Sequence, residues 1–317
     1  MLYKLYGLVI DIDNFISGVL SADGKHVDIR VRQGAFSKPF PTPSEWFIHW
    51  HFPEGELWLS FAKVNGGYLL RFKKFADFFV SHKGTRIAYL PKLGIPSETI
   101  NHLLLDQVIP LVINLRGSEA LHVSAILTPH GVIAFAGPSG SGKSMLAGTL
   151  FNMGYPIVSD DCLTLMEKNK VIYAIPAYPG LRLWGDAFKY LFGNNGTFKS
   201  VAHYTNKRRL EIEKIEAAYC TEPQSLKRLY AIADMTEAKG KANVFIERLS
   251  SQESFMAFVK CAFRLDITDH HMLRRQFHFL ERAASQVSVR RLTFARDFNI
   301  LPAVREAILK DLQDLDN

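Results

Sequence analysis

One stretch of eight residues constrains the fold of this chain more than any other. It reads Gly137-Pro138-Ser139-Gly140-Ser141-Gly142-Lys143-Ser144 and satisfies the pattern G-x-x-x-x-G-K-[S/T] at every fixed position. A five-residue apolar run, 132–136, precedes it, and a segment of helix-forming residues, 145–153, follows it. A buried strand, a glycine loop and a helix in this order are the context that the pattern requires. The sequence therefore predicts an α/β fold built around this loop.

The residues of the loop suit a phosphate ligand. Glycines let the backbone turn tightly, so successive N–H groups and the N-terminus of the next helix point at phosphate oxygens. The residues expected to bind phosphate in this way are Gly137, Ser139, Gly140, Ser141 and Gly142. Lys143 adds a catalytic positive charge at the β- and γ-phosphates, and the Ser144 hydroxyl is a ligand for Mg²⁺. We expect ATP and Mg²⁺ to bind here; the alternative is a glycine-rich turn that binds nothing.

Two adjacent carboxylates follow the loop. Asp160 and Asp161 stand 17 and 18 residues after Lys143, where a short expected strand, Ile157–Ser159, ends. Ligands collect at the carboxyl ends of strands in such sheets, so the pair and the loop should open onto one crevice. One carboxylate can hold the metal while the other accepts the proton of an attacking hydroxyl. The residues alone do not say which has which role, and an aspartate turn at a strand end is the alternative.

The chain divides into two parts by pattern. Residues 1–95 read as short strands rich in aromatic side chains, with a hairpin turn at Gly66-Gly67. Residues 96–317 mix strands and helices. They begin with a helix that Ser97 should cap and Pro110 should kink, and a single strand is expected over 119–127. The pattern predicts a strand-rich N-terminal domain, 1–95, and an α/β domain, 96–317.

Composition narrows the function classes. The chain has 317 residues and a net charge of +7, which is too mild to indicate nucleic acid as a partner. Its three cysteines, Cys162, Cys220 and Cys261, fit no metal spacing and indicate a reduced, cytoplasmic protein. The first 20 residues lack the basic start of a signal peptide, and the longest apolar stretch, 103–115, is too polar to span a membrane. Whether the chain forms a homo-oligomer stays open.

The motifs together resemble the C-terminal domain of the HPr kinase/phosphorylase family. The likeness lies in His122, in the strand and loop up to Ser144 and in residues 155–161, and it covers about residues 97–300. Two later stretches, 178–184 and 294–298, are similar to segments of HPr-kinase-like proteins from peptide-modification clusters. The resemblance implies a P-loop nucleotide-binding core of the HPr kinase C-terminal type.

The resemblance also implies a reaction. It is the ATP-dependent phosphorylation of a serine hydroxyl on a peptide or protein, with Asp160 as the base and Asp161 and Ser144 as metal-binding side chains. It places His122 near the γ-phosphate and lets Arg182 contact phosphate; without the resemblance His122 reads as an ordinary strand histidine. Related kinases phosphorylate the C-terminal serine of lasso-peptide precursors, so the resemblance implies an acceptor of that kind.

The chain departs from the family in two places. A Glu-x-Arg-Gly-type signature, whose glutamate helps bind metal, has no counterpart, because residues 176–184 contain no acidic side chain. Residues 1–90 do not resemble the family's regulatory domain, which argues against HPr itself as the substrate. A small-molecule kinase and an ATP-binding or ATP-hydrolysing regulator without an acceptor stay open as alternatives.

One basic cluster stands outside these motifs. Lys207-Arg208-Arg209 precedes an acidic patch over 211–216. The cluster could neutralise phosphate or hold an acidic peptide, and a solvated charged face is the alternative.

Overall fold

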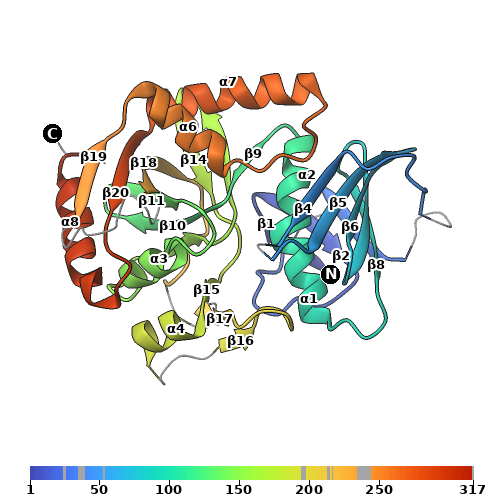
Figure 1. Ribbon diagram of the computed structural model, residues 1–317, viewed down its shortest axis with the longest axis horizontal. Coiled ribbons are helices and arrows are strands. Elements are labelled where there is room, and N and C mark those ends of the chain that lie inside the picture. Colours follow the sequence, from blue (N-terminus) through green and yellow to red (C-terminus); the bar gives the residue numbers. More distant parts are fainter. Residues whose placement is uncertain are drawn as a thin grey trace.

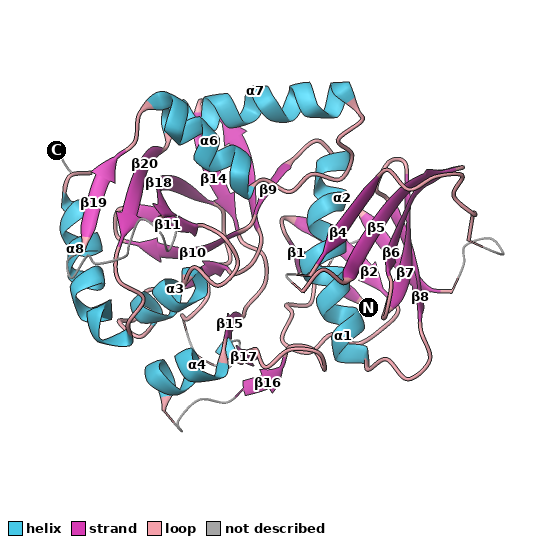
Figure 2. Cartoon of the chain, viewed as in Figure 1, coloured by secondary structure: helices cyan, strands magenta, loops and turns pink. Residues whose placement is uncertain are grey.

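Two large sheets and one small sheet organise the chain, which is a mixed α/β protein (Figures 1 and 2). The computed structural model describes residues 1–23, 26–34, 40–52, 54–193, 198–212, 215, 217–233 and 244–315. Each large sheet forms the centre of a lobe, and the two lobes lie side by side (Figure 1).

The N-terminal sheet has eight strands in the order β1-β2-β3-β8-β7-β6-β5-β4. These strands are β1 (Leu2–Leu5), β2 (Leu8–Ile12), β3 (Ile29–Gln33), β4 (Ile48–His51), β5 (Leu57–Val64), β6 (Gly67–Phe72), β7 (Ala76–Ser81) and β8 (Arg86–Pro91). β5 and β6 form the expected hairpin, but Val64 pairs with Gly67, so the turn consists of Asn65 and Gly66. Gly66 has the positive φ, 89°, that a tight hairpin turn favours.

A helical segment packs against this sheet. It consists of α1 (Ser97–Leu103), a π-helical turn (Leu104–Val108) and α2 (Ile109–Leu115) in direct succession. Its buried side chains share one hydrophobic cluster with those of the sheet. By packing, the segment lies with the N-terminal strands; the domain boundary suggested at residue 95 stays a prediction.

Two expectations for this segment differ from the structure. Ser97 is the first helical residue and caps nothing, because the N-cap is Pro96. The irregularity expected at Pro110 takes the form of the π-helical turn just before it, since proline lacks the N–H of a regular helix. This turn holds Asp106, whose side chain is buried.

The second lobe is built on a nine-stranded sheet. Its main path runs β12-β10-β11-β18-β14-β13-β9, and β20 and β19 continue beside β18. These strands are β9 (Glu119–Leu121), β10 (Val123–Thr128), β11 (Gly131–Ala136), β12 (Ile157–Ser159), β13 (Leu163–Lys168), β14 (Val171–Ile175), β18 (Gln224–Ile232), β19 (Phe245–Arg248) and β20 (Ser288–Thr293). β11 is parallel to β18 and β18 to β20, so the carboxyl ends of these three strands meet at one edge.

The single strand expected over 119–127 is in fact two strands. The chain breaks at His122, whose backbone N–H donates to the carbonyl of Cys261 at 2.6 Å. On one side of the break β9 pairs with β13, and on the other β10 pairs with β11 and β12. The prediction failed because the bond that ends the strand comes from a residue far away in the sequence.

Helices flank the second sheet (Figure 1). They are α3 (Lys143–Phe151), α4 (Gly185–Phe192), α6 (Ser251–Cys261), α7 (His270–Gln286) and α8 (Leu301–Gln313). A three-stranded sheet of β15 (Leu181–Leu183), β17 (Arg208–Leu210) and β16 (Phe198–Ser200) completes the lobe, and β15 contacts α3 and α4. None of the described helices combines the length and the apolar character that crossing a membrane requires.

Candidate functional site

The glycine loop follows β11 directly, and α3 begins at Lys143. Gly140 and Gly142 have φ angles of 75° and 98°, a left-handed conformation that glycine adopts without steric cost. Gly142 is also the N-cap of α3, so the end of the loop lies at the positive end of the helix dipole. Strand, loop and helix thus follow one another in the order that the sequence predicts, with a helix N-terminus facing the loop.

The Lys143 side chain folds back over the loop. Its Nζ donates to the carbonyls of Gly137 at 2.9 Å and Pro138 at 3.1 Å, and the residue is 5% exposed. Burial lowers the pKa of this ammonium group, while the charges of Asp161 and Asp160 oppose the shift. The Lys143 ammonium group therefore already lies at the loop. A phosphate that binds there takes the place of the two backbone carbonyls as its hydrogen-bond acceptor.

Asp160 lies buried beneath the loop, just past the end of β12. Its Oδ1 accepts hydrogen bonds from the Ser144 hydroxyl at 2.8 Å and the Ser124 hydroxyl at 2.5 Å. Its Oδ2 accepts from the backbone N–H of Arg182 at 2.7 Å. Burial and the neighbouring charge of Asp161 raise the pKa of Asp160, and Arg182 and the hydrogen bonds work against that rise. Both carboxylate oxygens are therefore engaged by protein donors.

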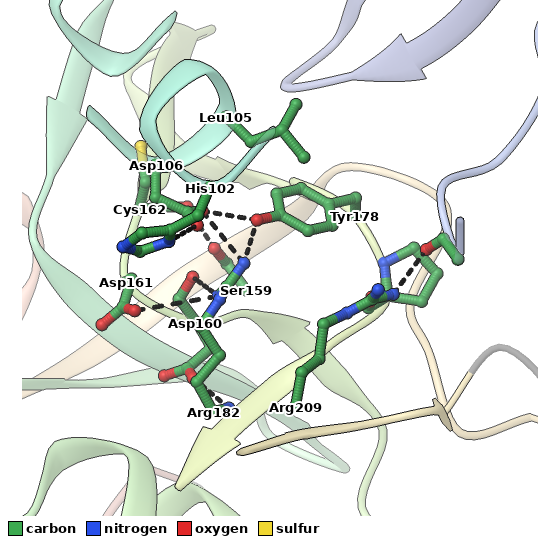
Figure 3. A network of polar contacts seen from close by, with 12 residues as sticks. His102, Leu105, Asp106, Ser159, Asp160, Asp161, Cys162, Tyr178, Arg182 and Arg209 are labelled. Atoms are coloured by element: carbon green, nitrogen blue, oxygen red, sulfur yellow. Dashed lines mark hydrogen bonds and ion pairs between the residues drawn. The ribbon is translucent and has the colours of Figure 1, made fainter. Parts of the chain in front are cut away.

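Asp161 lines a cavity, and one of its carboxylate oxygens lies 3.8 Å from the Arg182 guanidinium (Figure 3). Its φ of 68° is uncommon for a residue other than glycine, and the two neighbouring carboxylates point in different directions. Burial by itself raises the pKa of Asp161, but the charges of Lys207 and Arg182 hold it well below its usual range. Asp161 is therefore ionised at neutral pH.

A buried polar network joins the aspartate pair to the helical segment of the other lobe (Figure 3). The Arg182 guanidinium pairs with Asp106 at 3.0 Å and donates to the backbone carbonyl of Asp160 at 3.2 Å. Asp106 also contacts His102 Nδ1 at 2.8 Å and accepts from the Tyr178 hydroxyl. Arg182 is 3% exposed, and its guanidinium binds a carboxylate, a backbone carbonyl and the Tyr178 hydroxyl in the interior. The expected contact of Arg182 with phosphate stays a prediction.

Asp106 is the member of this network that sequence reasoning missed. In the sequence it is only one of the polar residues that interrupt the apolar stretch 103–115. A carboxylate inside an apolar helical run is costly to bury unless it has a partner, and this signal could have identified it as part of a network. Its partner Arg182 follows 76 residues later, and no local sequence pattern predicts that the two residues pair.

A cavity of about 450 Å³ brings these groups together. Its lining includes loop residues 139–145 together with His122, Asp161, Arg182, Trp184, Lys207, Phe294, Arg296 and Phe298. The loop thus meets both the basic cluster and the stretch 294–298, which lie far from it in the sequence. The acidic patch beside that cluster falls partly outside the described residues. A cavity of this size suits a ligand such as a nucleotide.

The lining of the cavity combines charged and aromatic side chains. Lys143, Asp161 and Lys207 supply charges beside the loop. Phe298 also lines the cavity, and its ring stacks at 4.8 Å on that of Tyr190, which lies outside the lining. Arg296 is a further lining residue, and its Nη1 donates to the carbonyl of Gly140 at 3.1 Å. The basic groups favour an anionic ligand, and the exposed ring face favours a flat apolar ring.

His122 lines the cavity near Lys143. Burial, reinforced by the charge of Lys143, lowers the pKa of His122 to about 4. Its ring lies 5.9 Å from that of Phe263. At neutral pH the imidazole is uncharged, so it can take part in hydrogen bonds but adds no positive charge to the cavity.

The oxygen ligands at the loop fit a magnesium ion. Within the described residues there is no group of three or more His, Cys, Asp or Glu side chains that could enclose a metal. The Ser144 hydroxyl and the Asp160 carboxylate are in direct contact, and Asp161 is adjacent. Mg²⁺ takes hard oxygen ligands, often one or two carboxylates completed by water and phosphate. These residues therefore suit Mg²⁺ that is held jointly with a nucleotide.

Comparison with known proteins gives a distant structural likeness. No family model matches the chain, and no curated protein matches it either. Among solved structures, the chain is similar to the HPr(Ser) kinase/phosphatase from Coxiella burnetii, with 10% sequence identity and a TM-score of 0.35. The match covers 62% of this chain and 99% of that one. That protein belongs to the family whose motifs the sequence resembles, but at this score the likeness is a distant structural relationship and carries no argument about function.

Proposed function

We propose that this chain is an ATP-dependent kinase that transfers the γ-phosphate to a hydroxyl group. One observation carries the proposal: the Ser144 hydroxyl, in the first turn of α3, donates to the buried Asp160 carboxylate at 2.8 Å. A loop serine joined to an aspartate at a strand end is the pair that holds Mg²⁺ in proteins that bind nucleoside triphosphates through a glycine loop. Lys143 stands beside both residues, as that chemistry requires.

In this proposal ATP lies along the cavity from one end to the other. The phosphates bind at the glycine loop, where Lys143 exchanges its carbonyl acceptors for β- and γ-phosphate oxygens. The adenine ring lies against Phe298. What supports this placement is that the cavity lining contains both the glycine loop and the Phe298 ring.

We assign the two carboxylates the reverse of the roles that the family resemblance implies. Asp161 is the base, because it faces the cavity where an acceptor hydroxyl can reach it. Asp160 is the metal-side carboxylate, because its oxygens are already held by Ser144, Ser124 and the N–H of Arg182. The low pKa of Asp161 makes it a weak base, but phosphoryl transfer mainly needs the attacking hydroxyl to be oriented.

The remaining charged groups complete the mechanism. Mg²⁺, when bound, neutralises charge that develops on the β- and γ-phosphate oxygens. Lys143 and Lys207 supply further positive charge on the same side, and the neutral imidazole of His122 is available for a hydrogen bond. Arg182 has a positioning role and does not act on the substrate. Asp106 holds its guanidinium, and the guanidinium in turn holds the backbone carbonyl of Asp160.

As the acceptor we propose a serine on a peptide or protein, and the C-terminal serine of a lasso-peptide precursor is the specific candidate. This part rests on the sequence likeness of the stretches 178–184 and 294–298 to kinases of peptide-modification clusters. Both stretches contribute residues to the cavity. A small-molecule hydroxyl is the alternative acceptor.

The test is to incubate the protein with Mg-ATP and a lasso-type precursor peptide that ends in serine, and to weigh the peptide by mass spectrometry. A gain of one phosphate that is absent with Lys143→Ala supports the proposal. ATP binding with an unmodified peptide refutes the specific acceptor and shifts attention to small hydroxyl compounds. A protein that binds no ATP in the presence of Mg²⁺ contradicts the kinase assignment as a whole.

A further inference from the structure

We propose that the groove between β4 and the segment after α6 docks the acceptor as an extended, acidic peptide that lies along the free edge of β4. The inference rests on the kinase function proposed above and adds the binding mode and the charge of the acceptor. It also gives the N-terminal sheet a part in the reaction.

The groove has a volume of about 610 Å³ and lies between the two lobes. One side is formed by Ile48, His49 and Trp50 of β4. The other side is formed by residues 260–264 and by Ile267. The groove and the nucleotide cavity share His122 and Ser139 in their linings. A chain that lies in the groove therefore ends beside the part of the cavity where the phosphates are proposed to bind.

The strand edge faces this groove. β4 is the last strand of the N-terminal sheet, and among the residues that the structure describes it pairs with β5 alone. Successive side chains of a strand point to opposite faces, yet the three consecutive residues 48–50 all line the groove. The groove therefore runs along the edge of β4 and not over one of its faces. An unpaired edge of this kind accepts a further strand through backbone hydrogen bonds.

The positive charge of the groove lining favours an acidic peptide. Lys260 and Arg264 carry full charges in the groove, and no acidic side chain appears among its described lining residues. Lys260 is exposed in the last turn of α6. Arg264 is half-buried and donates to the carbonyl of Val259 through one nitrogen. A positive lining opposite a strand edge favours an extended segment with acidic side chains.

The position of β4 relative to the glycine loop is fixed by contacts that cross between the lobes. Asp266, in the segment after α6, accepts a hydrogen bond from the Tyr68 hydroxyl at 3.1 Å and pairs with Lys63 at 2.8 Å. Lys63 also donates to Thr268 at 2.6 Å. Lys63 lies on β5, the strand next to β4, and Tyr68 lies on β6, the strand beyond it. The edge of β4 is thus held at a set distance from the phosphate end of the cavity.

The charge requirement is tested with a fluorescein-labelled peptide that alternates glutamate and valine and ends in serine. Its binding is followed by fluorescence anisotropy, with and without Mg-ATP. We expect Lys260→Glu to weaken binding about tenfold and a peptide with lysine in place of glutamate to bind far less well. The matched control is Lys310→Glu, which reverses an exposed lysine in the last turn of another helix, α8, and should leave binding unchanged. Equal binding by wild type and Lys260→Glu, or equal losses in both variants, would overturn the proposal.

The strand pairing is tested with two versions of the same peptide, each N-methylated at alternate residues in opposite phase. In a paired strand alternate N–H groups point toward the neighbour, so one version should lose binding about tenfold or more while the other retains it. Equal affinities of the two versions would show that the peptide does not add to the edge of β4.

Nucleotide binding is measured in parallel with a fluorescent ATP analogue, so that the two proposals fail separately. If the analogue binds and the acidic peptide does not, the docking proposal is wrong and the kinase proposal stands. If the peptide binds with the expected charge and phase dependence while the analogue does not, the groove is real and the kinase proposal is wrong.

Discussion

The two lobes differ in what they bury. The N-terminal lobe buries mainly apolar side chains, in one cluster that spans its sheet and the segment from α1 to α2. The second lobe buries ionisable groups around the glycine loop, among them Lys143, Asp160 and Arg182. The exception is Asp106, a buried carboxylate of the first lobe that pairs with Arg182 of the second. The reactive groups of the candidate site therefore lie in the second lobe, and the first lobe is mainly an apolar support. The ion pair between Asp106 and Arg182 makes the arrangement of those groups depend on both lobes.

The largest effect should come from the charged groups of the second lobe. We expect Asp161→Asn to lower kcat by about 10²–10⁴-fold and to leave the affinity for ATP within a few-fold, because the variant loses the base but keeps the cavity. Asp160→Asn should instead weaken the binding of Mg-ATP, because it disturbs the partner of Ser144. Steady-state kinetics with separate Mg-ATP titrations distinguish the two. If Asp160→Asn loses only kcat while Asp161→Asn loses nucleotide affinity, the roles are those that the family resemblance implies.

The second effect tests the ion pair between the lobes. Asp106→Asn leaves the buried Arg182 without its nearer carboxylate, while Asp161 remains at 3.8 Å, and we expect a loss of about 3 kcal/mol in the free energy of unfolding. Activity should fall too in protein that remains folded, because Arg182 positions the aspartate pair. Urea denaturation and kinetics at a temperature well below the transition measure both quantities.

The control for this variant lies wholly within the second lobe. Arg228 is a second buried arginine, and it pairs with Asp311 on α8. Asp311→Asn should lower stability in a similar way but leave the kcat of the folded protein unchanged, since that pair does not touch the aspartate pair. Equal losses of kcat in the two variants would mean that Asp106 acts through general stability alone.

A smaller effect concerns Phe298, the aromatic lining residue that is proposed to contact the adenine. We expect Phe298→Ala to raise the KM for ATP about tenfold and to leave kcat unchanged, because a stacking surface is lost far from the reacting phosphates. GTP and ATP titrations measure the change and show whether the ring recognises the base. A fall in kcat without a change in KM would place the adenine elsewhere.

The smallest effect is a pH dependence of stability. The pKa of His122 is about 4 in the folded protein against an ordinary value of 6.5. The unfolded chain therefore binds a proton at His122 that the folded chain does not, so stability falls as the pH drops from about 6.5 toward 4. Urea titrations at pH 7 and pH 5 should show a smaller decrease for His122→Gln than for the wild type. Identical decreases would mean that His122 titrates normally.

How much could be predicted from sequence depends on how local each feature is. The order of strand, glycine loop and helix was predictable, because the motif and its apolar strand are contiguous. Strand β12 was predicted with its observed bounds for the same reason. The break at His122 was not, because it depends on the carbonyl of Cys261. The hairpin turn differed by one residue, since adjacent glycines do not say which of them occupies the turn.

The candidate site shows the same limit. The proximity of the loop to the aspartate pair followed from strand topology, but the distinct surroundings of Asp160 and Asp161 did not, because both are acidic residues in one turn. The positive φ of Asp161 and the hydrogen bonds to Asp160 separate them, and these arise from Ser124 and Arg182. Lys207 lines the cavity because it directly precedes β17 of the small sheet. The pairing of β15, β16 and β17 could not be predicted from any local sequence pattern.

The long separation between Asp106 and Arg182 has a consequence for synthesis of the chain on the ribosome. The strands and helices of the first lobe are complete at Leu115, 67 residues before the chain reaches Arg182. A nascent chain that ends between these points has His102, but not yet Arg182, beside the buried carboxylate of Asp106. The first lobe should therefore be less stable during this interval than after β15 has emerged.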